Sequence, residues 1–297
     1  MCGIAGLFLK DDKLAPELGA LLAGMLGTLC DRGPDSAGFA VYGREIPGST
    51  KLTVRAGADV DLDCLLRDLS VAAAAPLDHE ARDTHVVIAV PVAQEAAVRR
   101  QLASAPDVSV VGSGRRMEIF KEVGRPDEVA RRFGLDKMAG THAIGHTRMA
   151  TESEVTTAGA HPFTTGPDQC LVHNGSLSNH CSVRRELARH GLAFQTNNDS
   201  EVAAGYLTWK LHEGWSLAQA LESSLDTLDG FYTFVVGTES GFGVLRDPIA
   251  CKPAVMAETD RWVAFGSEYR ALVDLPGIDA AKIWEPEPAK VYQWERH

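Results

Sequence analysis

Cys2 is the residue whose position most directly suggests chemistry. Once Met1 is removed, its thiol lies beside a free α-amino group on the same Cα, and such groups have an ordinary pKa of about 7.7–8.0. This amine can take the thiol proton, directly or through a water, so the nucleophile needs no histidine base. Because initiator methionine is usually trimmed before a small side chain, we expect Cys2 to become the first residue. A cysteine at position 2 is more often inert, so the hypothesis depends on its companions.

Further segments carry side chains suited to hydrolysing an amide of an amino acid. Arg148 ends a strand-like stretch, and a guanidinium binds an α-carboxylate through two parallel hydrogen bonds. Thr151 supplies a hydroxyl three residues later. Asn174 and Gly175 could donate a side-chain amide and a backbone N–H to an oxyanion. Asp199 stands at a predicted helix start, where it could cap the helix or bind a substrate ammonium.

Each of these features also has an ordinary structural explanation. Arg148 could form a surface ion pair, and Asn174-Gly175 could form a type I′ turn. Asp199 could be a plain helix cap, and the segment RGPD that begins at Arg32 could be a plain tight turn. Taken singly, each explanation is preferable to a functional one. Their joint presence, in this order after Cys2, favours a site.

The elements expected to position these residues predict an α+β fold. Strands at both ends of the chain, with helices between them, indicate layers rather than alternating β-α units. The segment 84–136 has a β-α-β-β-α order that resembles much of a ferredoxin-like module, and we expect it as an insertion in a domain spanning 2–297. Strands are predicted at 3–9, 36–43 and 51–57, and helices at 16–30, 178–190, 200–213 and 216–228.

Composition excludes several classes of function. The 297 residues carry a net charge of -11, which argues against a nucleic-acid or anionic-membrane surface. No stretch approaches the roughly 20 apolar residues of a membrane span, and the N-terminus lacks the features of a signal peptide. The six cysteines are scattered without a metal-like pattern, which is typical of reduced thiols in a cytoplasmic protein. We therefore expect a cytoplasmic protein that binds no metal or cofactor itself.

Together the motifs resemble the glutaminase domain of class II glutamine amidotransferases, within the N-terminal-nucleophile hydrolase superfamily. The resemblance implies a four-layer αββα sandwich, with the 84–136 module on its periphery. The matching segments span nearly the whole chain and are CGIAG (2–6), RGPDSAG (32–38), GHTRMAT (145–151), AHPF (160–163), HNGSLSN (173–179), NDSE (198–201), DGFYTFVV (229–236), RDPIACKP (246–253) and FGSE (265–268).

The resemblance also implies a role for each matching residue. Cys2 would attack the glutamine amide and form a γ-glutamyl thioester, while Asn174 and Gly175 hold the oxyanion. Arg148 would bind the α-carboxylate with help from Thr151, and Asp199 the α-ammonium. The remaining residues of the binding region are Arg32, expected to order the loops around the nucleophile, and His161 and His173, expected to be structural.

The chain departs from the family pattern in ways that bear on its partners. Met149 and Glu152 stand where several relatives carry Trp and His, so the loop over glutamine is expected to close differently. The chain ends soon after the last motif, which predicts that a synthase domain is supplied by another chain. The resemblance extends to the small subunit of N-methylglutamate synthase and glutamate-synthase-like complexes, whose partner chains would carry FMN and iron–sulfur clusters.

Two alternatives remain open at this stage. The chain could be an N-terminal-nucleophile hydrolase of another amide, although Arg148 with Asp199 suits a zwitterionic amino acid. It could instead be a catalytically silent regulatory subunit that binds glutamine, although the set of site residues is complete.

Overall fold

The computed structural model describes residues 1–150 and 154–296, and its larger sheet has seven antiparallel strands in the order β15-β13-β14-β1-β8-β2-β7. β1 (Gly3–Leu9) lies near its centre, between β8 (His142–Arg148) and β14 (Trp262–Gly266). The other members are β2 (Ser36–Tyr42), β7 (Met117–Val123), β13 (Val255–Glu258) and β15 (Lys282–Trp284).

A second antiparallel sheet has five strands in the order β16-β12-β11-β10-β9. β10, which pairs with β11 on one side and β9 on the other, carries the HNGS segment near its end. The strands are β9 (Phe163–Gly166), β10 (Gln169–Leu177), β11 (Gly230–Gly237), β12 (Gly241–Arg246) and β16 (Tyr292–Glu295).

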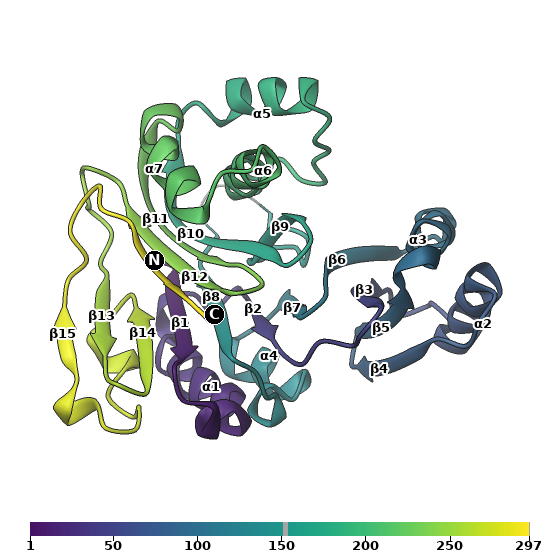
Figure 1. The fold of residues 1–297 in the computed structure, drawn as a ribbon, viewed down its shortest axis with the longest axis horizontal. Coiled ribbons are helices and arrows are strands. Elements are labelled where there is room, and N and C mark those ends of the chain that lie inside the picture. Colours follow the sequence, from purple (N-terminus) through teal and green to yellow (C-terminus); the bar gives the residue numbers. More distant parts are fainter. Residues whose placement is uncertain (151–153, 297) are drawn as a thin grey trace.

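The two sheets pack face to face and helices cover both outer sides (Figure 1). The alternation along β1 explains this, since Ile4 and Phe8 enter the core between the sheets whereas Leu7 and Leu9 enter the core beneath a helix. The predicted αββα sandwich is therefore confirmed. Over the larger sheet lie α1 (Leu18–Thr28) and α4 (Pro126–Arg132), and over the smaller sheet α5 (His180–Arg189), α6 (Asp199–His212) and α7 (Leu217–Thr227).

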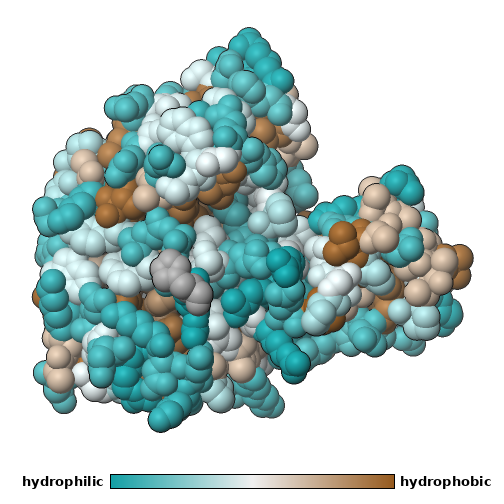
Figure 2. All heavy atoms as spheres, viewed as in Figure 1, coloured by the Kyte–Doolittle hydropathy of each residue, from teal (hydrophilic) through white to brown (hydrophobic). Residues whose placement is uncertain are grey.

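A four-stranded sheet forms a separate lobe, which projects from the main body in Figures 1 and 2. Its elements follow the split β-α-β order of ferredoxin-like folds, with sheet order β4-β5-β3-β6. Leu52, Leu69 and Ile88 contribute to a core of its own. The elements are β3 (Ser49–Ala56), α2 (Leu62–Ala73), β4 (Asp78–Arg82), β5 (His85–Pro91), α3 (Glu95–Ser104) and β6 (Val108–Gly114).

The lobe therefore spans 49–114, which corrects the predicted range of 84–136. β7 follows β6 after a tight turn, yet β6 pairs with β3 in the lobe whereas β7 pairs with β2 in the sandwich. The Asp168 carboxylate fixes this turn, accepting hydrogen bonds from the backbone N–H groups of Arg115, Arg116 and Met117 at 2.5, 2.9 and 2.9 Å. Two adjacent strands of similar pattern do not reveal that they belong to different sheets.

The shorter elements are 3-10 helices, and some of them flank the site described below. None of the helices in the described part of the chain is long and apolar enough to cross a bilayer. The 3-10 helices are η1 (Asp12–Glu17), η2 (Cys30–Arg32), η3 (Val92–Gln94), η4 (Leu135–Lys137), η5 (Tyr269–Ala271) and η6 (Ile278–Ala280).

Candidate active site

Cys2 lies at the edge of the sandwich where β1 begins and β8 ends. Antiparallel pairing places Gly3 opposite Thr147, so the residues after β8 pass directly beside Cys2. The backbone N–H of Met149 points at Cys2 Sγ, with 3.4 Å between the two atoms. The thiol is partly exposed, so an incoming molecule can reach it.

Arg32 anchors the backbone of Cys2 from the other side. Its Nε donates a hydrogen bond of 3.0 Å to the Cys2 carbonyl, and its Nη1 forms an ion pair with Glu268. The turn after Arg32 packs so tightly that a Cβ on Gly33 would lie 2.4 Å from the carbonyl carbon of Thr147. RGPD is thus more than a plain turn, because it holds Arg32 between the Cys2 backbone and Glu268, which follows β14.

Asn174 and Gly175 form part of a strand and not the type I′ turn that the sequence also allowed. They pair with Thr233 and Tyr232 of β11. Gly175 has a φ of +151°, and a Cβ there would lie 2.0 Å from the Phe231 carbonyl oxygen, so a side chain is excluded. The Nδ2 atom of Asn174 donates to the Cys2 carbonyl at 3.2 Å, which turns its donor end toward the candidate nucleophile.

Arg148 is 5% exposed, so it is a buried residue and not the surface residue that was also considered. It ends β8 opposite Ser36, and its carbonyl accepts a 3.1 Å hydrogen bond from the Asp35 backbone N–H. Nη1 lies 3.4 Å from the Glu154 carbonyl oxygen. The structure thus brings Arg148 to the same end of β8 as Met149. Thr151, predicted to assist Arg148, lies outside the described residues.

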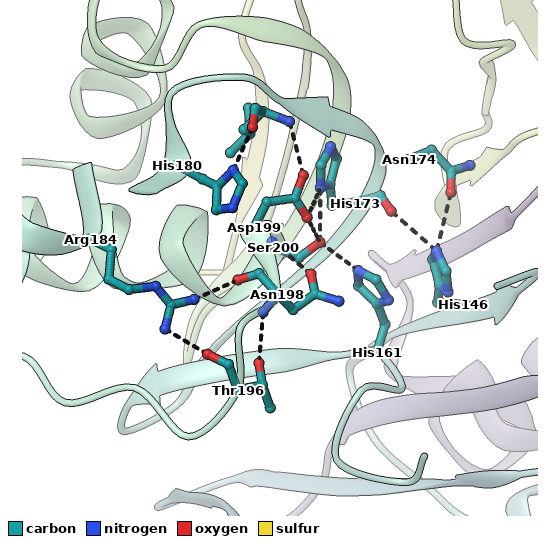
Figure 3. A network of polar contacts seen from close by, with 11 residues as sticks. His146, His161, His173, Asn174, His180, Arg184, Thr196, Asn198, Asp199 and Ser200 are labelled. Carbon is teal, nitrogen blue, oxygen red and sulfur yellow. Dashed lines mark hydrogen bonds and ion pairs between the residues drawn. The ribbon is translucent and has the colours of Figure 1, made fainter. Parts of the chain in front are cut away.

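Asp199 is the first residue of α6, and the helix cap is its neighbour Asn198. The Asn198 side chain accepts the backbone N–H of Ser200 at 2.9 Å, which leaves the Asp199 carboxylate available for other contacts. Asp199 Oδ2 accepts the backbone N–H of Leu177 at 2.9 Å, so the carboxylate is fixed against the end of β10. This places the Asp199 carboxylate beside the end of the strand that carries Asn174 (Figure 3).

Two charged side chains hold the loop that leads into Asp199. Arg184 of α5 donates to the carbonyls of Thr196 and Asn198 at 2.6 and 3.2 Å (Figure 3). Glu201 accepts the backbone N–H groups of Gln195 and Thr196 at 2.7 and 2.8 Å. The loop is therefore anchored from both sides, and this fixes the position of Asp199 at its end.

His161 and His173 lie behind Asp199 and share one hydroxyl (Figure 3). Ser200 Oγ is 3.0 Å from His161 Nε2 and 2.8 Å from His173 Nδ1, and it donates to Asp199 Oδ1 at 3.3 Å. A hydroxyl has one hydrogen to donate, so both histidines must donate to Ser200 when that hydrogen points at Asp199. The pair thus supports the carboxylate from within the protein.

Burial keeps these histidines and others in the neutral form. It lowers the pKa of His173 to about 4 and of His146 to about 3, and it also lowers the pKa of His161. Elsewhere in the fold, burial lowers the pKa of His85 to about 4 and of His142 to about 3.

These histidines predict that the protein loses stability as pH falls from 6.5 to 5. The unfolded chain takes up a proton at each histidine near pH 6.5, whereas the folded chain does not until pH 3 to 4. Each such histidine therefore lowers the free energy of unfolding by up to ~1.4 kcal/mol per pH unit below that point. Urea unfolding at pH 7.5, 6.5 and 5.5 measures the effect; a midpoint that is unchanged between pH 6.5 and 5.5 would show that these side chains titrate normally.

Sequence reasoning missed two further residues of this cluster. Ser267 follows β14, and its Oγ accepts both Asn174 Nδ2 at 3.2 Å and the Ile4 backbone N–H at 2.9 Å. His146 of β8 contacts the Asn174 side chain, with 3.1 Å between His146 Nε2 and Asn174 Oδ1. His146 lies in the motif GHTR and Ser267 in the motif FGSE. The motifs therefore marked both residues, but they did not indicate that either contacts Asn174.

A cavity of about 620 Å³ lies away from this cluster, between the lobe and the sandwich. Glu95 and Ser113 line it from the lobe, and Gln169 and Trp215 from the sandwich. Gln169 is the first residue of β10, whereas Asn174 is near the last, so the cavity lies toward the opposite end of that strand.

Comparisons with known proteins agree on one family. Residues 146–274 match the family described as glutamine amidotransferase domain. The chain is 62% identical over 297 residues to the glutamine amidotransferase-like protein GlxB of Rhizobium meliloti (strain 1021), covering 99% of this chain and 98% of that protein. It is 36% identical over 315 residues to a putative glutamine amidotransferase of Methanothermobacter thermautotrophicus, covering 99% and 100%.

Among solved structures, the fold is similar to the glutamine phosphoribosylpyrophosphate amidotransferase of B. subtilis. The TM-score is 0.63 at 21% identity, over 99% of this chain and 47% of that one. The chain thus spans about half the length of that structure, and the likeness concerns the fold alone.

Proposed function

We propose that this chain, which belongs to the glutamine amidotransferase family, is of class II and that Cys2 hydrolyses the side-chain amide of glutamine. We propose further that the ammonia passes to a separate synthase chain. The observation that carries the first part is the convergence on Cys2. The Met149 N–H points at its sulfur, while Arg32 and Asn174 both donate to its carbonyl.

The reaction would begin when Met1 is removed and the α-amine of Cys2 takes the thiol proton. The thiolate attacks the amide carbon, and the electron pair of the C=O bond moves onto oxygen. Asn174 Nδ2 and the Gly175 N–H would hold that oxyanion. Its collapse expels ammonia, which takes the proton from the α-amine and leaves a γ-glutamyl thioester. Water then releases glutamate and restores the thiol.

Substrate selection would depend on two buried or anchored charges. Arg148, at the end of β8, would bind the α-carboxylate with Thr151. Asp199, at the start of α6 and held against the last residue of β10, would bind the α-ammonium. Arg32 would act on the position of Cys2, because its guanidinium already contacts the Cys2 carbonyl and Glu268. His161 and His173 would act through Ser200 on Asp199.

Delivery of ammonia to another chain is the second part of the proposal. Its support is that the sandwich and its lobe account for the described strands, and that two relatives align over nearly their whole length. We propose a partner of the glutamate-synthase or N-methylglutamate synthase type, in which FMN and iron–sulfur clusters reside on the partner chains.

Purification of the native complex through this chain tests both parts. We expect a co-purifying chain with a flavin spectrum, and a synthase product that forms from glutamine and also from added ammonia or methylamine. No turnover of glutamine in that complex would contradict the glutaminase. Glutamine turnover at full rate by the isolated chain, with no acceptor chain in the preparation, would contradict delivery alone.

A further inference from the structure

The direction of the Asn174 side-chain amide decides whether it can stabilise an oxyanion. Its two ends have nearly the same size and shape, but only the NH₂ end donates hydrogen bonds. A rotation of half a turn would present a carbonyl oxygen to the developing negative charge. A site that uses Asn174 as a donor therefore needs a neighbour that distinguishes the two ends.

The structure assigns this task to His146, a positioning residue that holds the oxygen end of Asn174 and so turns its NH₂ end toward Cys2. This inference rests on the proposed glutaminase function. His146 is fully buried in β8, and its Nε2 lies 3.2 Å from the His173 carbonyl oxygen and 3.1 Å from Asn174 Oδ1 (Figure 3).

The backbone carbonyl of His173 determines the tautomer of His146. A carbonyl oxygen can only accept, so the hydrogen of the imidazole must be on Nε2. That same N–H then faces Asn174 and requires an acceptor there, which only Oδ1 provides. Among the described residues, Nδ1 of His146 has no hydrogen-bond partner, as expected for the ring nitrogen that carries no hydrogen.

The opposite end of the amide faces two oxygen atoms, a backbone carbonyl that can only accept and a hydroxyl that accepts here. Asn174 Nδ2 lies 3.2 Å from the Cys2 carbonyl oxygen and 3.2 Å from Ser267 Oγ, which accepts it. A reversed amide would oppose N–H to N–H at His146 and oxygen to oxygen at Cys2. When Nδ2 leaves the Cys2 carbonyl for the oxyanion, His146 remains as the contact that preserves the direction.

Ring packing keeps His146 itself in place. It stacks on His161 with 4.0 Å between ring centroids and an interplanar angle of 27°. His161 is in turn held by Ser200, at 3.0 Å from Nε2 to Oγ. The burial that lowers the pKa of His146 to about 3 keeps it in the neutral form throughout the working pH range.

Two variants of His146 test the inference in steady-state ammonia release from glutamine. His146→Leu fills the space without a donor, whereas His146→Gln can place its Nε2 close to the imidazole Nε2. We expect His146→Leu to lower kcat by about 10- to 100-fold, less than the loss on removing an oxyanion donor itself. KM should change less than kcat, because the oxyanion exists only in the transition state. His146→Gln should restore most of the rate.

A double-mutant cycle with Asn174→Ala separates positioning from a merely structural role. In the Asn174→Ala background His146→Leu should cost little more, because the amide it directs is gone. Three results would each overturn the inference. These are losses in kcat that multiply in the double mutant, an effect on KM alone, and a His146→Gln variant that is as impaired as His146→Leu.

The tautomer of His146 in the wild-type chain gives a second measurement that does not depend on the variants folding. Nitrogen-15 NMR of labelled histidine should show a neutral ring protonated at Nε2 from pH 8 to 6. A ring protonated at Nδ1, or a positively charged ring, would overturn the inference. If the wild type releases no ammonia from glutamine, the proposed function fails, whereas an active wild type with an unaffected His146→Leu variant refutes the positioning role alone.

Discussion

Replacing Cys2 with alanine should abolish glutamine hydrolysis, with a loss in kcat on the order of 10⁴-fold or more. In the proposed reaction the thiol supplies the atom that attacks the amide, and the Met149 N–H is directed at its sulfur at 3.4 Å. Alanine has no sulfur, so the γ-glutamyl thioester cannot form at this position. The measurement is ammonia release from glutamine, with Cys64→Ala as the matched control, because Cys64 is an exposed cysteine in the lobe.

The same Cys2→Ala variant separates catalysis from structure when it is tested within the complex. Product formation from added ammonia should persist, because the acceptor reaction does not need the thiol. Equal loss of the glutamine-dependent and ammonia-dependent reactions would mean that Cys2 serves assembly, and the regulatory alternative would then gain support.

Replacing Asp199 with asparagine should lower kcat/KM for glutamine by about 10²-fold, with most of the change in KM. An asparagine oxygen can still accept the Leu177 N–H, now 2.9 Å from Asp199 Oδ2, so the geometry is retained while the charge is lost. The missing interaction is the one with the substrate ammonium. Asp226→Asn on the exposed face of α7 is the control, since it removes the same charge away from the site.

A second substrate makes the Asp199 prediction specific. Glutaramate keeps the amide and the carboxylate of glutamine but lacks the α-ammonium. Wild type should prefer glutamine strongly, and Asp199→Asn should reduce that preference by lowering activity on glutamine only. Equal losses on both substrates would show that Asp199 stabilises the site and does not bind the substrate ammonium. A wild type that prefers glutaramate would favour the alternative of a hydrolase that acts on another amide.

The fold was predictable because its central strands are continuous buried runs and its motifs match a known family. The Ile4 and Phe8 positions of β1 against Leu7 and Leu9 already indicated two buried faces. The lobe boundary was not predictable, because β6 and β7 have similar local patterns and differ only in their partners. Sheet membership is a long-range property, and a turn of two arginines does not encode it.

The candidate site was predictable at the level of residue types. Arg148 ends β8, Asn174 lies near the end of β10 and Asp199 begins α6, as their motifs indicated. Asn198 rather than Asp199 caps the helix, and two adjacent capping side chains in the sequence cannot be ranked without coordinates. Contacts between motifs, such as His146 with Asn174, depend on how the two sheets face each other.

The most direct test of the central claim is to trap the enzyme during turnover and locate the covalent intermediate. Protein isolated from cells would be mixed with glutamine, quenched with acid and mapped by mass spectrometry. We expect a γ-glutamyl group on Cys2, on chains that have lost Met1. A γ-glutamyl group on any other residue, or turnover by chains that retain Met1, would contradict it.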